Sequence, residues 1–379
     1  SNTAAAGAVT GTVTMGAASS IGGAGNFSIS DAVSGGFALT KVGAGEVSLN
    51  GANTYSGTTT ISGGTLKIGG SGNLTAGIYT PTISIASGAT FKYSSSADQR
   101  IDGVISGAGN LVKDTSTSSI LTLYTQTNTY TGSTSIQAGT LRIASATSLN
   151  GTSSITVGSD ATSLATLDLW GYSPNLGTRS LVLNGYGVGG ASGAVGAIGS
   201  TSGNSTLYAD NISFGSDVRI GTSNNLTMQG ATVNLGIAGS NALTKVGAGT
   251  LTVTGNNNTY NGNVKVAAGN LDLNGNFASG SNIDIVSGAA LRYTYTSDGS
   301  LTGLISGAGN LQLGSNVTLT LGGTAANTYS GTTDFSTTGT LKAGKTNAFG
   351  TSIVFSSSAN TSVIDVNGQS LANEFRIKG

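Results

Sequence analysis

A phrase of sixteen residues recurs along the chain, and this repetition limits the possible folds more than any other feature. It reads NTYSGTTTISGGTLKI at 53–68, and close variants occupy 128–143, 258–273 and 327–343. A second phrase precedes it, as ALTKVGAGEVSLNG and ALTKVGAGTLTVTG show at 38–51 and 242–255. Recurrence of this kind predicts a stack of similar units, each of which contacts its neighbours.

Within each phrase, apolar and polar residues alternate, as where Leu66 and Ile68 flank Lys67. A period of two is typical of β-strands, and Gly, Asn and Ser end the short runs as turn residues do. We expect the leucines that share one position in the phrase to form one inward layer, with Thr65 and Thr140 beside them facing outward. These leucines are Leu66, Leu141, Leu271 and Leu341.

The spacing of the phrases distinguishes between β architectures. A propeller needs blades of equal size, whereas an open stack tolerates insertions because each coil contacts only its neighbours. The unequal spacing found here therefore predicts an all-β fold, a single elongated parallel β-helix (β-solenoid). It would run through residues 1–379, with two related halves, 38–185 and 242–379, joined by 186–241.

The composition excludes several classes of function. Charged residues make up 8% of the chain, against about 25% in ordinary soluble domains. Fifteen basic residues balance fifteen acidic ones, which predicts binding neither to nucleic acid nor to an anionic membrane surface. The chain has no His and no Cys, so it lacks the commonest general base and metal ligands. We expect no catalytic residues, no metal and no cofactor. No run approaches the ~20 apolar residues that cross a bilayer, so we expect no membrane insertion by this segment.

Two stretches that join both phrases identify a family resemblance. LTKVGAGEVSLNGANTYSGTTTISGGTLKI at 39–68 and LTKVGAGTLTVTGNNNTYNGNVKVAAGNLDL at 243–273 resemble the autotransporter-associated β-strand repeat of secreted bacterial passenger regions. Segments 111–143 and 311–343 are looser matches. The resemblance implies a right-handed parallel β-helix that is extracellular or at the outer surface of a bacterium. Because this repeat carries no catalytic residues, it implies a scaffold and not an active site.

Two short segments are candidates for contact with a glycan or a partner. SADQRIDG contains Asp98, Arg100 and Asp102, and the alternative interpretation is a solvated corner loop. TLDLWGYSPNLG contains Trp170 and Tyr172, and the matching segment of the second half has no aromatic residue there.

Other features have simpler explanations. The phrase tyrosines Tyr55, Tyr130, Tyr260 and Tyr329 could form an exposed row for stacking sugars, but packing beside a corner is the favoured role. Asp168 is matched by Asp365 in the second half, which indicates an ordinary outward strand position. The glycine-rich run at 187–200 is expected to be a flexible loop.

These observations favour a non-enzymatic surface or secreted rod that serves adhesion, aggregation or matrix assembly. Its partners would be a host or neighbouring-cell surface, a glycan or the matrix. One alternative is a glycan-binding or polysaccharide-degrading β-helix. Another is a fibre subunit that stacks end to end, because no polar cap is legible at either end of the sequence and exposed strand edges pair with other chains. End-to-end or lateral self-association therefore remains open.

Overall fold

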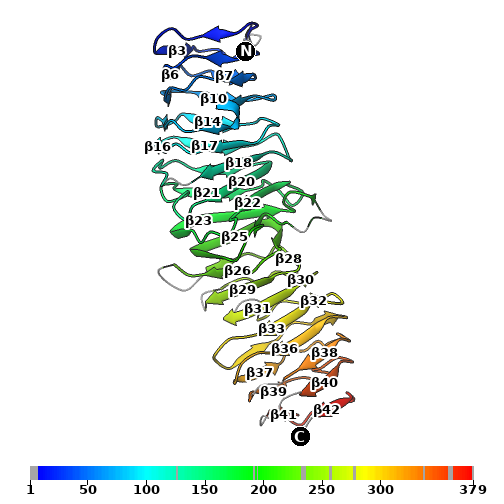
Figure 1. Cartoon of the computed structure of the whole chain (residues 1–379). Helices are drawn as coiled ribbons and strands as arrows, with labels where there is room; N and C mark the ends of the chain where they lie inside the picture. Colours follow the sequence, from blue (N-terminus) through cyan, green and yellow to red (C-terminus); the bar gives the residue numbers. More distant parts are fainter. Residues whose placement is uncertain are drawn as a thin grey trace.

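The chain folds into short strands joined by turns. A computed structural model describes residues 7–124, 127–190, 193, 195–231, 236–255, 258–275, 279–335, 338–356 and 362–377. None of these residues forms an α-helix, and η1 (Thr75–Gly77) is a single 3₁₀ turn. The strands stack as a parallel β-solenoid of about 17 turns, with the two termini at opposite ends (Figure 1). The predicted fold class is confirmed.

Parallel pairing links the strands into ladders that run along the rod, because each strand bonds to strands of the coils before and after it. The first ladder comprises β1 (Gly7–Val9), β4 (Phe27–Ile29), β7 (Glu46–Leu49), β10 (Thr65–Ile68), β14 (Thr90–Tyr93), β17 (Asn110–Lys113), β19 (Thr134–Ile136), β21 (Ser154–Val157), β23 (Asn175–Gly185), β25 (Ser205–Thr222) and β27 (Gly236–Ala238). The second comprises β3 (Ser19–Gly22), β6 (Leu39–Val42), β9 (Thr59–Ile61), β13 (Ile83–Ile85) and β16 (Ile105–Gly107). The third comprises β12 (Ile78–Tyr79), β15 (Gln99–Ile101), β18 (Ile120–Tyr124), β20 (Gly139–Ala144), β22 (Ala165–Asp168), β24 (Ile198–Ser200), then β25 again, β28 (Leu243–Val246), β30 (Val264–Val266), β32 (Ile283–Ile285) and β35 (Ile305–Gly307).

Two further ladders complete the second half. The fourth starts from β25 and comprises β26 (Leu226–Gln229), β29 (Thr250–Gly255), β31 (Asn270–Gly275), β33 (Ala290–Tyr293), β36 (Asn310–Leu313), β38 (Thr332–Asp334), β40 (Ile353–Ser356) and β42 (Phe375–Ile377). The fifth comprises β34 (Gly299–Leu301), β37 (Thr318–Leu321), β39 (Thr340–Ala343) and β41 (Val363–Asp365). Two short pairs stand apart, β2 (Val13–Thr14) with β5 (Val33–Ser34) and β8 (Ala52–Asn53) with β11 (Asn73–Leu74).

Equivalent phrases of the two halves lie in different ladders. The strand LTKV is β6 in the second ladder, but its repeat β28 continues the third ladder from β25. The strand of the sixteen-residue phrase shows the same change, since β20 lies in the third ladder and β39 in the fifth. The repeated phrases therefore do not share one face of the rod.

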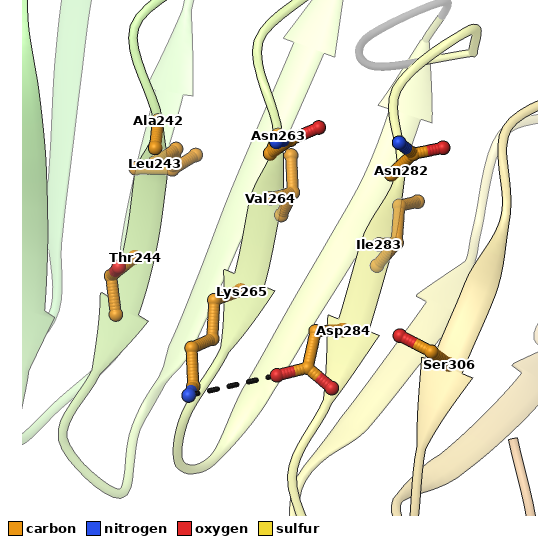
Figure 2. Close-up of a pocket in the computed structure, with 10 residues that line it drawn as sticks. All are labelled: Ala242, Leu243, Thr244, Asn263, Val264, Lys265, Asn282, Ile283, Asp284 and Ser306. Atoms are coloured by element: carbon orange, nitrogen blue, oxygen red, sulfur yellow. Dashed lines mark ion pairs between the residues drawn. The ribbon is translucent and has the colours of Figure 1, made fainter.

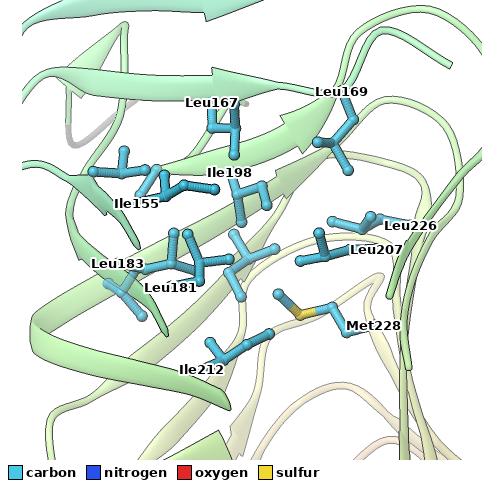
Figure 3. Packing of buried hydrophobic residues seen from close by; sticks show 14 of the residues in the cluster. Ile155, Leu167, Leu169, Leu181, Leu183, Ile198, Leu207, Ile212, Leu226 and Met228 are labelled. Carbon is cyan, nitrogen blue, oxygen red and sulfur yellow. The ribbon is translucent and has the colours of Figure 1, made fainter. Parts of the chain in front are cut away.

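The core is a set of columns of inward aliphatic side chains. Val47, Leu66, Phe91 and Leu111 stack in register through four coils, and all four are fully buried. Figure 3 shows the same arrangement farther along the rod, where Leu167 and Ile198 belong to neighbouring rungs. Each such side chain contributes about 2 kcal/mol by leaving water, so the repeated Leu and Ile positions supply the main stabilisation.

The four phrase leucines are buried, as expected, but they do not form one layer. Leu66, Leu141, Leu271 and Leu341 are at most 1% exposed and lie in the first, third, fourth and fifth ladders, respectively. The expectation of a single layer was wrong because unequal turn lengths shift the phrase from one face to another.

Two smaller expectations also need correction. Thr140 is buried and does not face solvent. It lies beside Thr166 of the next rung, and the segment at Val188 covers this place, since the Val188 N–H donates to Thr166 Oγ1. The run at 187–200 is not a loop throughout, because residues 198–200 form β24. Residues 191, 192 and 194 of that run lie outside the described residues.

Candidate functional site

The recurring tyrosines are interior residues. Tyr55, Tyr130 and Tyr329 have no exposed surface, and Tyr260 is 5% exposed. These rings form no exposed row for sugars; their burial agrees with the packing role favoured from the sequence. Burial raises the pKa of Tyr130 to about 12, although the hydrogen bond with Thr134 opposes the increase.

Each tyrosine hydroxyl belongs to a buried polar network. The Tyr130 hydroxyl lies 2.6 Å from Thr134 Oγ1, and the Tyr329 hydroxyl lies 2.6 Å from Thr333 Oγ1. Where the phrase has Val264 in place of threonine, the Tyr260 hydroxyl donates to the backbone carbonyls of Asn241 and Asn263, both at 2.9 Å. A buried phenol hydroxyl needs a hydrogen-bond partner. The partner is a threonine hydroxyl where the phrase has threonine, and backbone carbonyls where it has valine.

The phrase asparagines connect successive coils. Asn128 Oδ1 accepts the N–H of Ile105 at 2.8 Å, and Asn128 Nδ2 donates to the Ser148 carbonyl at 2.9 Å. Asn327 makes the same two bonds with Ile305 and Ala348. The NTY tripeptide is therefore a corner joint, and its repetition is explained by structure alone.

Three buried lysines were missed by the sequence analysis. The side chains of Lys41, Lys113 and Lys245 have no exposed surface. Lys41 Nζ donates to the carbonyls of Val42, Gly43 and Gly63 at 2.9–3.0 Å, and Lys245 Nζ donates to Val246, Gly247 and Ala268 at 2.8–3.1 Å.

Burial controls the titration of these lysines. Removal from water lowers the pKa of Lys113 and of Lys245 to about 8, because it penalises the charged form. The available sequence signal was the repeated KVGAG, in which Gly43 and Gly247 have φ of +74° and +78° and turn the corner over the ammonium.

An aromatic and arginine strip lies on the outer face of the third ladder. We use this name for Arg100, Tyr124, Arg142, Trp170 and Tyr172. The ladder register places Arg100 beside Thr122 and Thr122 beside Arg142, on β15, β18 and β20. Arg142 in turn lies beside Asp168 on β22. The two candidate segments chosen from the sequence thus lie on one face, separated by the two outward rung positions of Thr122 and Arg142.

Stacking organises the first end of the strip. The Arg100 guanidinium carbon lies 3.6 Å from the centroid of the Tyr124 ring. The same guanidinium bonds Asp102 through two nitrogens, both at 2.6 Å. Arg100 lies within β15 and not in a loop, which corrects the corner-loop interpretation for this residue. Asp98 is exposed and caps the next coil, since its Oδ1 accepts the N–H of Ile120 at 2.8 Å.

A buried carboxylate organises the other end. Asp168 is 1% exposed, so it is not the ordinary outward residue expected from the sequence. It accepts the Arg142 Nε at 2.9 Å, the Trp170 N–H at 3.0 Å, and both the N–H and the hydroxyl of Thr201. The Arg142 guanidinium lies 5.1 Å from the Trp170 ring, whose centroid is 6.5 Å from that of Tyr172.

A shallow groove of 310 Å³ lies farther along the third ladder. Figure 2 shows Thr244, Lys265, Asp284 and Ser306 on its floor, one from each of β28, β30, β32 and β35. Lys265 and Asp284 form an ion pair of 3.6 Å, and their side chains are 52% and 44% exposed. Within the parts of the chain that the structure describes, no group of three or more acidic residues could hold a metal ion.

The fold and its repeated corners define the chain as a β-solenoid repeat protein. Three segments, 39–68, 118–143 and 243–273, match the family model described as the passenger-associated-transport-repeat. Over 345 residues the chain is 31% identical to a protein described as adhesin BmaC autotransporter from Brucella suis biovar 1 (strain 1330). The alignment covers 82% of this chain and 9% of that adhesin. The chain is an autotransporter passenger repeat protein, as its resemblance predicted.

The same comparisons indicate an extracellular or cell-surface location. No solved structure matches the chain significantly. In the described ranges, no helix is long and apolar enough to cross a membrane.

Proposed function

We propose that this segment is a non-enzymatic section of an adhesin-like surface rod, whose side contacts a host cell, a neighbouring cell or the matrix. The observation that carries the proposal is the 31% identity to an adhesin across 82% of the chain. Because the chain spans 9% of that adhesin's length, adhesion by this particular segment is an inference.

The construction of the rod supports a scaffold role. The polar groups of the repeated Asn, Tyr and Lys residues are hydrogen-bonded inside the rod, so these residues contribute stability and supply no reacting group. Three carboxylates are held by arginines, in the Arg100–Asp102, Arg142–Asp168 and Arg292–Asp272 pairs. Hydrolysis of glycosides uses a pair of carboxyl groups on either side of the scissile bond, whereas each of these three carboxylates is bonded to an arginine.

Beads coated with the purified chain would test the proposal. Adherence to cultured cells, to bacteria and to extracellular matrix is expected to exceed that of albumin-coated beads. Clumping of the coated beads with one another would identify self-association as the activity. Beads that neither adhere nor clump would contradict an adhesive role for this segment.

A further inference from the structure

We propose that the aromatic and arginine strip binds an uncharged, extended polysaccharide laid along the rod axis. The proposal rests on the proposed adhesin-like function and assigns a ligand class and a site to it. Four observations carry it: the backbone at Trp170, the residues at the matching positions of the second half, the charge balance of the strip and its spacing.

The backbone at Trp170 is unusual. Its φ is +46°, in the left-handed region that a bulky side chain rarely adopts. The matching residue Asn367 has φ +49°, and asparagine tolerates that region well. The turns are otherwise alike: Asp168 Oδ1 accepts the N–H of Trp170 at 3.0 Å, and Asp365 Oδ1 accepts that of Asn367 at 2.9 Å. A strained position occupied by the chain's one tryptophan points to a role beyond folding.

The second half has the same frame without the stacking groups. The repeated phrases match Arg100 with Ser300, Tyr124 with Gly322, Trp170 with Asn367 and Tyr172 with Gln369. The frame itself is retained, since Asp98 and Asp298 each accept the N–H that opens the next strand, from Ile120 and Thr318. The corner therefore needs none of the strip's aromatic or guanidinium groups, and packing does not explain their presence.

The charge balance favours a neutral ligand. Each arginine of the strip is paired with an aspartate, Arg100 with Asp102 and Arg142 with Asp168. An acidic polymer would have to compete with these carboxylates for the guanidinium groups. An uncharged sugar can stack its C–H face on an aromatic ring, while its hydroxyls bond to the remaining N–H groups and carboxylate oxygens.

The spacing and width favour a chain molecule. Tyr124 lies on β18 and Trp170 directly follows β22, two rungs on, and rungs are ~4.8 Å apart, which separates the two rings by roughly 10 Å along the axis. Alternate residues of an extended β-linked glycan present the same face at a comparable repeat. A protein partner usually buries ~800 Å² on each side around an apolar centre, whereas this strip is narrow and carries the Arg100–Asp102 and Arg142–Asp168 ion pairs along its length.

Titration with defined oligosaccharides tests the proposal. Cellohexaose and laminarihexaose are the neutral probes, and hyaluronan hexasaccharide is the acidic comparison. The intact 379-residue chain is expected to bind a neutral probe. Trp170→Asn should weaken that binding about tenfold or more, a change of ~1.4 kcal/mol. Because Asn367 occupies the same turn, this variant should keep its circular dichroism spectrum.

Matched variants separate the site from the rest of the rod. Arg100→Ser installs the residue of the second half and should weaken binding in the same way, whereas Asn367→Ala should leave it unchanged. Three results would overturn the proposal: no binding of either neutral probe, equal binding by folded Trp170→Asn protein, or binding of the acidic probe alone.

The adhesion assay distinguishes this failure from failure of the proposed function. Absence of oligosaccharide binding, together with bead adherence that is equal with and without Trp170→Asn, would contradict the proposed glycan site and leave the adhesin proposal intact. Binding of a neutral glycan without any bead adherence or clumping would contradict the adhesin proposal, while the strip would still be supported as a glycan-binding site.

Discussion

Residues 98–172 and 298–369 run through the same series of strands and corners, yet they present different surfaces. Inside, Tyr130 and Tyr329 each form a hydrogen bond with a threonine hydroxyl, and Asn128 and Asn327 join equivalent pairs of rungs. Outside, the stacking groups Arg100, Tyr124, Trp170 and Tyr172 of the first region are matched by small or polar residues in the second, and only Arg142 is matched by another cation, Lys342. The residue type at an interior position is restricted by neighbours on every side, whereas the residue type at an outward position is restricted only by solvent and ligands. A difference that adds backbone strain on the outside is therefore informative about function.

The largest expected effect concerns alkaline pH, which should act on both regions alike. Burial raises the pKa of Tyr130 and of Tyr329 to about 12 from the ordinary 10. Between pH 10 and 12 the unfolded chain loses these protons first, so the folded state binds more protons and its stability falls as pH rises. Two pKa units correspond to about 3 kcal/mol for each ring. The part of the tyrosinate absorbance that Tyr130→Phe or Tyr329→Phe removes should appear only as the rod unfolds, which circular dichroism follows. If that part appeared near pH 10 in the folded rod, the interior around the ring would be open to solvent.

One buried lysine should make the first region more stable as pH rises through a milder range, which is the opposite of the effect of the tyrosines. Lys113 has a pKa of about 8, against 10.5 for a free lysine, and its match in the second region is the buried Leu313. From pH 8 to 10.5 the folded state loses this proton before the unfolded state does, so its stability rises with pH. Lys113→Leu should reduce that rise in the stability measured by urea denaturation, and the remaining rise should come from Lys245, whose pKa is also about 8. An unchanged slope would mean that Lys113 does not titrate in this window.

Next in size are the core leucines, which should again behave alike. Leu141→Ala and Leu341→Ala should each cost about 2–5 kcal/mol, because each leaves a cavity in a stacked column. Urea denaturation followed by circular dichroism measures the loss. A cost below about 1 kcal/mol in one region alone would show that its interior packs more loosely than the other.

The aspartates should separate the regions. Asp168 is buried and has four hydrogen-bond donors, whereas the side chain of Asp365 is 41% exposed and pairs with Lys342 at 3.4 Å. Asp168→Ala should cost about 2–3 kcal/mol, less than for a fully buried pair because Arg142 reaches solvent. Asp365→Ala should cost at most about 1 kcal/mol. The same denaturation measurement applies, and equal costs would contradict the burial difference.

The smallest expected effect is the most specific to the strip. Trp170→Asn removes left-handed strain of about 1–3 kcal/mol but also removes the contacts with Arg142 and Tyr172. The two changes oppose each other, so we expect a net change in stability within about 1 kcal/mol. The reverse change, Asn367→Trp, adds strain without a stacking partner and should destabilise by about 1–2 kcal/mol. Thermal unfolding of both variants checks the contrast, and two changes of the same sign and size would contradict it.

The sequence was sufficient for the fold because one local rule repeats. Alternation around Leu66 and Leu271 predicted strands, and recurrence predicted stacking. Which face each phrase would occupy could not be predicted, because it depends on the summed length of every turn. The burial of Lys41 was hidden for another reason: the alternation places it on the inward face with Leu39, but a charged residue is assigned to solvent unless its partners are known, and here the partners are corner carbonyls.

The candidate site was only partly predictable. Arg100, Trp170 and Tyr172 stood out in the sequence, but their convergence depends on the coil lengths that align β15 with β22. Tyr124 attracted no attention, since it ends an ordinary strand. A comparison of Tyr124 with Gly322 in the repeated phrase was the signal that could have found it.

The buried lysines have a consequence for how the rod is assembled during folding. Each ammonium takes two carbonyls from its own corner and a third from the following coil, Gly63 for Lys41, Ala138 for Lys113 and Ala268 for Lys245. If either of the two coils is missing, the ammonium keeps at least one donor without a partner, whichever coil forms first. At these three places the neighbouring coils should therefore form and unfold together, so each lysine adds cooperativity to a rod in which each coil contacts mainly its neighbours.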